Sequence, residues 1–155
     1  MRSHYCGQVT ESLVGQQVEV CGWVHRRRDH GGVIFIDLRD REGVVQVVID
    51  PAAPEIFALA ERVRSEFVLR VSGTVRPRPD GTENNHLPTG RVEINAEALE
   101  LLNRAEPLPF QIEDEAELSE EVRLRYRYLD LRRPPMQQRL MMRSRAARVL
   151  RRFLD

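Results

Sequence analysis

The chain has 155 residues, no net charge from 24 basic and 24 acidic side chains, and 41% hydrophobic residues. This length accommodates one domain of ordinary size and part of a second. No apolar run approaches the roughly 18 residues of a membrane-spanning helix, and the N-terminus lacks the apolar stretch of a secretory signal. Cys6 and Cys21 lack the spacing of a metal or redox motif. We therefore predict a cytoplasmic protein with no membrane segment.

The charges are unevenly distributed along the chain. Residues 106–121 carry seven acidic side chains and no basic ones, whereas 122–155 carries eleven arginines and two acidic residues. Such a change in composition marks a domain boundary. The expected organisation is a first domain at 1–104, an acidic linker at 105–120 and the start of a second domain at 121–155.

Five segments alternate apolar and polar residues, with glycine or proline between them, as half-buried strands do. The expected strands are 17–28, 33–39, 44–50, 67–76 and 91–99. Between the third and the fourth, Ile56, Leu59, Ala60 and Val63 recur at helical spacing. A five-stranded Greek-key barrel with one helix between strands three and four is the OB-fold, which commonly binds oligonucleotides. We therefore predict an all-β OB-fold barrel.

The alternation also predicts which side chains face away from the core. In 33–39 the bulky Ile34, Ile36 and Leu38 share one face, so Phe35 points outward. An outward aromatic ring can stack on an unpaired RNA base, at a gain of about 1–3 kcal/mol. The alternative is that Phe35 covers the barrel end or packs under the turn-rich loop 77–90, which itself is either a flexible connection or a loop that closes on RNA.

The same alternation turns Gln46 and Glu93 outward from the third and fifth strands. The inward residues of these strands are Val45, Val47, Ile49, Val92 and Ile94. A carboxylate repels phosphate, but Glu93 suits the adjacent N–H donors of guanine. Gln46 is a candidate polar contact to a base, or an ordinary exposed strand residue.

Arginines supply the expected backbone contacts. The run of arginines from Arg26 to Arg28 ends the first strand and is placed to contact phosphate, with Arg76 and Arg78 as additional RNA contacts. An ordinary solvated surface would have the same charges. The four histidines, His30 among them, lack ligand spacing, so no metal site is predicted.

The C-terminal part reads as two helices. Ser119 is a suitable N-cap for a helix over 119–133, and Pro134 begins another helix over 134–155. The second has an apolar stripe among its arginines, formed by Leu140, Ala147, Leu150 and Leu154. Such a stripe normally packs against another part of the protein, so it indicates a truncated second domain. The alternative is a basic helix that contacts RNA backbone or a membrane surface.

Two stretches together carry a family resemblance. RRRDHGGVIFIDLRD at 26–40, with RYRYLDLRRP at 125–134, resembles the N-terminal part of a bacterial-type aspartyl-tRNA synthetase, a class IIb enzyme. Lysyl and asparaginyl synthetases share the barrel pattern more loosely. In this family the OB domain binds the tRNA anticodon, so the resemblance implies anticodon contacts at Arg26, Arg28, Phe35, Gln46 and Glu93. The aspartate anticodon begins with guanine or its queuosine derivative, which fits the proposed role of the carboxylate.

The resemblance also implies what the full-length protein does. A helical linker would lead into a truncated α+β class II domain, whose motifs beyond Asp155 would hold ATP, aspartate and magnesium in a homodimer that charges tRNA(Asp). This fragment would hold no cofactor and no catalytic residue and would not make aspartyl-adenylate. His30 and Gly81 resemble the residues of enzymes that also charge tRNA(Asn), unless both are simple turn residues.

Two other functions are compatible with a barrel of this kind. A free-standing single-strand-binding OB protein would need several outward aromatics, and the sequence offers Phe35 and Trp23. It would have no use for the segment at 125–134. A protein-binding adaptor barrel would favour an apolar surface patch instead of arginines.

Overall fold

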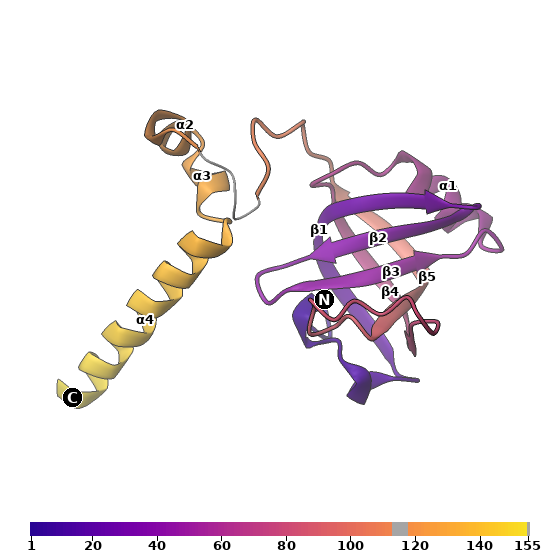
Figure 1. Cartoon of the computed structure of the whole chain (residues 1–155), viewed down its shortest axis with the longest axis horizontal. Coiled ribbons are helices and arrows are strands. Elements are labelled where there is room, and N and C mark those ends of the chain that lie inside the picture. The colour runs from indigo at the N-terminus through magenta and orange to yellow at the C-terminus, as the bar shows by residue number, and fades with distance from the viewer. Residues whose placement is uncertain (113–117, 155) are drawn as a thin grey trace. The chain divides into compact units, whose positions relative to one another are not determined.

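The computed structural model describes residues 1–112 and 118–154. It divides the chain into two compact units, Met1–Pro107 and Leu108–Asp155 (Figure 1). This division falls within the stretch 105–120 that was expected to be a linker. The most acidic part of that stretch, 113–117, lies outside the described residues.

The first unit is a closed barrel of five strands (Figure 1). Its elements are β1 Gln17–His30, β2 Val33–Arg39, β3 Val44–Ile49, α1 Pro54–Arg62, β4 Val68–Pro77 and β5 Val92–Asn103, preceded by short 3₁₀ turns at Cys6–Gln8 and Glu11–Leu13. The strands follow one another around the barrel in the order β1-β2-β3-β5-β4. Only β3 and β5 pair in parallel within the described sheet. The OB-fold prediction is confirmed.

The barrel core consists of the residues that strand alternation placed inward. The predicted inward set, Ile34, Ile36, Leu38, Val45, Val47, Ile49, Val92 and Ile94, is buried throughout. Ala60 of α1 joins this cluster, and Ile56 and Phe57 pack against it. The helix thus closes the barrel with one apolar face, which is the usual source of stability for a short helix.

A bulge at His25, just before the arginine run, decides which arginines face outward. The register of β1 against β2 shifts there, so Arg26 and Arg28 lie opposite outward residues of β2 while Arg27 lies opposite a core residue. Arg27 Nε instead donates to the carbonyl of Ala60, at 3.0 Å, near the end of α1. Arg27 therefore ties the helix to the barrel, and the run does not act as one basic surface.

Three outward strand residues are more buried than alternation indicates. Gln46 is 7% exposed, Val48 3% and Glu93 1%, although none belongs to the hydrophobic core cluster. They share a pocket with residues of the loop 78–91, which follows β4. The expectation of solvent-exposed side chains was wrong, because strand alternation gives the face of the sheet but not what covers that face.

The described residues of the second unit form three helices in place of the two expected (Figure 1). They are α2 Glu120–Arg125, α3 Arg127–Asp130 and α4 Pro134–Leu154. Ser119 caps α2 as predicted, its hydroxyl accepting from the backbone N–H of Val122 at 3.4 Å. The predicted continuous helix over 119–133 is wrong, because Tyr126 has non-helical dihedrals, φ −110° and ψ 45°.

The break in the helix accompanies a buried ionic cluster. Asp130 is fully buried, with carboxylate oxygens 3.1 Å from Arg123, 2.6 Å from Arg127 and 3.4 Å from Arg133. Burial alone would raise the pKa of Asp130, but hydrogen bonds from Arg123 and Arg133 and the charges of Arg123 and Arg127 outweigh it, and the pKa is lowered. Asp130 is thus a charged centre that holds α2, α3 and the turn before α4 together.

The predicted apolar stripe of α4 is uncovered in the described unit. Leu140, Leu150 and Leu154 are 44%, 62% and 79% exposed. None of the helices in the described residues combines the length and apolar character that crossing a membrane requires.

Candidate functional site

A pocket of about 480 Å³ opens on the outward side of the barrel, between the strands and the loop 78–91. Its lining residues are Arg28, His30, Val33, Phe35, Gln46, Val48, Arg76, Arg78, Pro79, Thr82, Asn84 and Glu93. All five strands contribute residues to it, so distant parts of the sequence meet here. Four of the five residues predicted to contact an anticodon line this pocket; the fifth, Arg26, is exposed nearby on β1.

A chain of hydrogen bonds crosses the outward face of all five strands; we call it the polar network. Arg28 Nη2 on β1 donates to Asp37 Oδ1 on β2, at 2.8 Å, and to Gln46 Oε1 on β3, at 3.2 Å. Gln46 Nε2 donates to Glu93 Oε2 on β5, at 2.8 Å. Arg76 Nε on β4 donates to Glu93 Oε1, at 2.9 Å. Each side chain is thereby held in place before any ligand arrives.

Strand register explains why these side chains meet. Asp37 pairs with Gln46, Gln46 pairs with Glu93, and Glu93 pairs with Arg76 across successive strands. Residues directly opposite each other have Cβ atoms about 4.5–5.5 Å apart, within hydrogen-bonding reach of longer side chains. The network also fixes the amide of Gln46, whose oxygen accepts from Arg28 and whose nitrogen donates to Glu93.

Glu93 is the most buried charged group of the pocket. Its side chain is 2% exposed, while that of its partner Arg76 is 46% exposed. Each carboxylate oxygen already accepts one hydrogen bond, but a carboxylate offers about four acceptor positions. Glu93 can therefore accept further donors from a ligand that displaces the half-exposed guanidinium of Arg76, without losing its hydrogen bond from Gln46.

Phe35 provides the aromatic wall of the pocket. It is half-buried on the outward face of β2, and its ring meets the edge of His30 at a centroid distance of 6.0 Å and an interplanar angle of 62°. This edge contact with His30, which lies across the β1–β2 hairpin, orients the ring of Phe35. The structure thus places His30, predicted from the resemblance, beside the ring, whereas Gly81 is absent from the described lining.

Gly81 has a local structural reason to be glycine. Its φ is +82°, in the left-handed region that other residues avoid, and its backbone N–H donates to Glu83 Oε2 at 3.0 Å. This geometry agrees with the alternative that Gly81 is a turn residue.

Arg78 lies at the base of the loop and lines two pockets. It is 8% exposed, and its Nε donates to the carbonyl of Val92 at 3.1 Å. Burial lowers the pKa of Arg78, while the charges of Glu93 and Asp37 oppose that shift. An arginine remains charged at neutral pH despite such a shift, so Arg78 adds positive charge beneath the loop.

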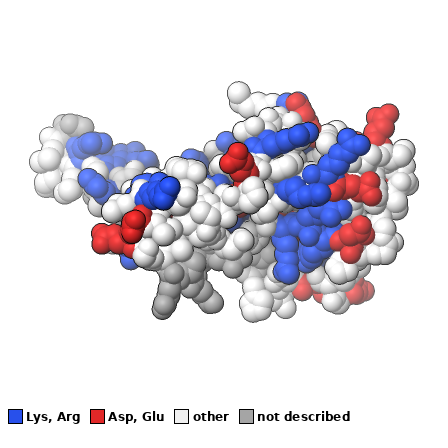
Figure 2. Space-filling model, turned by 90° about the horizontal axis from the view of Figure 1, so that it is seen from above, with Lys and Arg blue, Asp and Glu red and all other residues white. Residues whose placement is uncertain are grey.

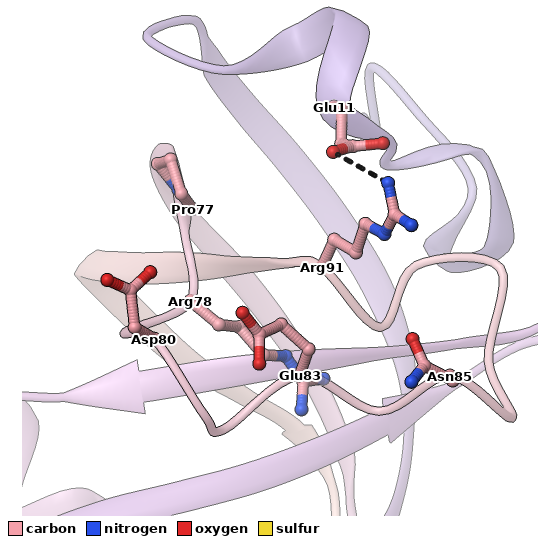
Figure 3. A pocket seen from close by; sticks show the side chains of 7 residues that line it. All are labelled: Glu11, Pro77, Arg78, Asp80, Glu83, Asn85 and Arg91. Carbon is pink, nitrogen blue, oxygen red and sulfur yellow. Dashed lines mark ion pairs between the residues drawn. The ribbon is translucent and has the colours of Figure 1, made fainter.

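The second pocket beside Arg78 has a different character (Figure 3). Glu11, Asp80 and Glu83 line it together with two arginines, and Arg91 points toward Glu11 at 3.7 Å. Three carboxylates against two guanidinium groups disfavour a phosphate-bearing ligand. The pocket at Phe35, which has three arginines and one carboxylate, is the better candidate.

The site is equipped for binding. Charged donors, an oriented amide, a buried carboxylate and an aromatic ring recognise a flat polar ligand next to an anionic group. Figure 2 shows arginines gathered over one part of the barrel surface, with acidic side chains among them. The described residues form no cluster of three or more His, Cys, Asp or Glu side chains suited to a metal ion.

Comparison with known families identifies the barrel. Residues 18–102 match the family of OB-fold nucleic acid binding domains, which covers more than half of the chain. The chain belongs to this OB-fold family. A second match, to class II tRNA synthetases for D, K and N, covers residues 119–155. The two matches together place this OB-fold chain among the class II aminoacyl-tRNA synthetases and disfavour a free-standing OB protein.

Solved structures agree with this placement. An asparaginyl-tRNA synthetase from Pyrococcus horikoshii, complexed with asparaginyl-adenylate, is 30% identical with a TM-score of 0.70 over 84% of this chain and 29% of that one. An aspartyl-tRNA synthetase from Entamoeba histolytica has a TM-score of 0.83 at 19% identity, over 96% of this chain and 36% of that one, which shows the fold alone. An OBody bound to hen egg-white lysozyme is 28% identical, with a TM-score of 0.59 over 68% of this chain and 96% of that one.

The chain therefore spans about a third of the length of the synthetases that it matches. The class II family assignment made from the sequence is confirmed. The comparisons do not separate an aspartyl from an asparaginyl enzyme.

Sequence reasoning missed Asp37 and Asn84 as parts of the site. Asp37 holds Arg28 in the polar network, and Asn84 lines the pocket from the loop. The alternation of β2 predicts that Asp37 faces outward on the same side as Phe35. It does not predict that Asp37 accepts a hydrogen bond from Arg28. The position of Asn84 depends on how the loop folds back, for which the sequence carries no periodic signal.

Proposed function

We propose that this chain is the anticodon-binding region of an aspartate-tRNA ligase, and that its OB-fold barrel binds the anticodon of tRNA(Asp) in the pocket at Phe35. The observation that carries the proposal is the polar network. It holds Gln46 and Glu93, two residues that the resemblance assigns to the anticodon, in fixed orientation beside an aromatic ring. Single-stranded RNA loops are recognised by such stacking and edge contacts.

In this proposal one base stacks on Phe35 while its neighbours meet the polar groups. Glu93 accepts the adjacent N–H donors of the guanine that begins the anticodon. Arg76 moves aside toward solvent, where its half-exposed guanidinium can meet a phosphate. Arg28, held by Asp37 and Gln46, acts as a positioning residue for the amide of Gln46.

Titration of the chain with RNA stem-loops tests the function. We expect a stem-loop with the GUC anticodon to bind more tightly than one with a scrambled loop, because edge contacts depend on base identity whereas phosphate contacts do not. Equal binding of both stem-loops would refute anticodon recognition and favour a single-strand binder without sequence preference. Failure of both to bind would favour a protein-binding barrel.

We further propose that tRNA(Asn) is a second ligand. His30 at the pocket and the similarity to an asparaginyl enzyme support this extension. A stem-loop carrying the asparagine anticodon would then bind with an affinity close to that of GUC. A strong preference for the aspartate anticodon would count against it.

Arg26 is the candidate for a pure backbone contact. It is exposed on β1 and points to the same face as Phe35. We expect Arg26→Ala to weaken the GUC and scrambled stem-loops by the same factor and to reduce the salt slope of log K by about one. The control is Arg62→Ala, which removes one exposed arginine from α1. A loss confined to the GUC stem-loop would place Arg26 among the base contacts instead.

For the full-length protein we propose a cytoplasmic homodimer that attaches aspartate to tRNA with ATP and magnesium. The match of residues 119–155 to class II synthetases supports this. The catalytic chemistry would lie in parts of the protein beyond the residues described.

A further inference from the structure

A third pocket lies on the barrel at a distance from the polar network. It has a volume of about 390 Å³ and involves Tyr5, Trp23, Arg2 and Arg41 among its lining residues. None of these residues belongs to the site proposed for the anticodon. The pocket combines two aromatic rings with two arginines, which is the composition of a nucleotide-stacking site.

The arginines of this pocket are already arranged around an aromatic ring. The guanidinium carbon of Arg2 lies 4.2 Å from the centroid of Tyr5, and that of Arg41 lies 4.7 Å from it. Cation–π contacts of this kind hold long side chains in a restricted set of positions. Both guanidinium groups are therefore kept at the pocket, where they can meet a phosphate with a smaller loss of side-chain entropy.

The acidic residue of the pocket, Asp40, already accepts hydrogen bonds from the protein's own backbone. Asp40 is 8% exposed, and its carboxylate accepts from the backbone N–H of Cys6 at 2.7 Å and of Glu42 at 2.9 Å. Its charge is thus partly balanced by backbone donors. Burial raises the pKa of the Cys21 thiol, which lines the same pocket, so that this thiol is neutral. Arg41 Nε also donates to Glu42 Oε1 at 3.1 Å, an exposed ion pair that a phosphate can displace.

The pocket continues the face that carries Phe35. Phe35, Asp37 and Arg39 alternate along the outward side of β2, and Arg39 pairs with Trp23 on β1. Four residues of strand advance by about 13 Å, at about 3.3 Å per residue. An OB-fold contacts about 4–16 nucleotides of a single strand, so a strand bound at Phe35 is long enough to reach Trp23.

We propose that this pocket binds one further nucleotide of single-stranded RNA. Its base stacks on Trp23, and its phosphates meet Arg2 and Arg41, which the Tyr5 ring holds at the pocket. The proposal rests on the proposed function, because it extends the RNA path beyond the pocket at Phe35. Within that function it assigns a second stacking site at the opposite end of the β1–β2 ladder.

Trp23 is the only tryptophan of the chain and reports directly on this pocket. We expect the GUC stem-loop to quench Trp23 emission with the same Kd that a fluorophore on the RNA reports, because a stacked base changes the surroundings of the indole. The quench should persist in Phe35→Ala at saturating RNA, since the two rings hold different nucleotides. In Arg41→Ala the salt slope should fall by about one, whereas Arg62→Ala should keep the wild-type slope.

The outcomes separate the two proposals. Stem-loop binding that depends on Phe35, with unchanged Trp23 emission and a wild-type salt slope for Arg41→Ala, would overturn the second stacking site and leave the anticodon function intact. Absence of any stem-loop binding would overturn both. Trp23→Phe provides a check of the signal, because it should remove the emission change while the labelled RNA still binds.

Discussion

Replacing Phe35 with alanine is expected to weaken binding of the GUC stem-loop by about 1–3 kcal/mol while the barrel stays folded. The ring is half-buried on the outward face of β2 and outside the core cluster, so its loss opens the pocket without creating a cavity in the core. Its edge contact with His30 contributes less to the free energy of unfolding than a core side chain does. Binding is measured with labelled RNA, and folding by the thermal unfolding midpoint.

Phe35→Leu is the matched control for size. Leucine keeps apolar volume in the pocket but has no ring to stack on a base, so it should lose affinity nearly as alanine does. Wild-type affinity of Phe35→Ala would show that the ring is only a cover for the barrel. Unfolding of both variants would instead place Phe35 among the residues that stabilise the barrel.

The second large effect is expected for Glu93→Gln. The substitution keeps the shape but places an N–H donor against Gln46 or Arg76, both of which donate to Glu93 now. The preference for guanine at the first anticodon position should disappear, at a cost of about 1–3 kcal/mol for the guanine stem-loop. Fluorescence titration against stem-loops that differ only at that base measures the preference.

Glu97→Gln is the control for this substitution. Glu97 lies on the same strand and also accepts two side-chain hydrogen bonds, from Thr74 at 2.6 Å and Gln17 at 2.9 Å, but it is exposed and outside the pocket. Should Glu93→Gln fail to fold, a stem-loop with inosine in place of guanine removes one N–H donor from the RNA side. Full affinity for the inosine stem-loop would exclude Glu93 as acceptor of that amino group.

The C-terminal helices show which helix boundaries local sequence preferences predict and which they do not. The cap at Ser119 and the start of α4 at Pro134 were predictable, because capping and proline preferences act within one turn. The break at Tyr126 was not. It depends on the burial of Asp130 among three arginines and on contacts of the Tyr126 ring with Phe110, whose centroids lie 6.3 Å apart.

The barrel shows most clearly which features follow from the sequence alone and which depend on the tertiary structure. The sequence by itself determined the five strands, the helix between β3 and β4, and the inward and outward faces, because side-chain alternation follows from strand geometry alone. Those faces identified Phe35, Gln46 and Glu93 as candidates. Only the tertiary structure decided that Gln46 and Glu93 are buried and that Arg28 orients Gln46, because these facts depend on pairing between strands far apart in the chain and on the covering loop. The bulge at His25 was also beyond the reach of the sequence, since a register shift exists only between two strands; it reverses the alternation of β1 so that Arg26 and Arg28, and not Arg27, face outward.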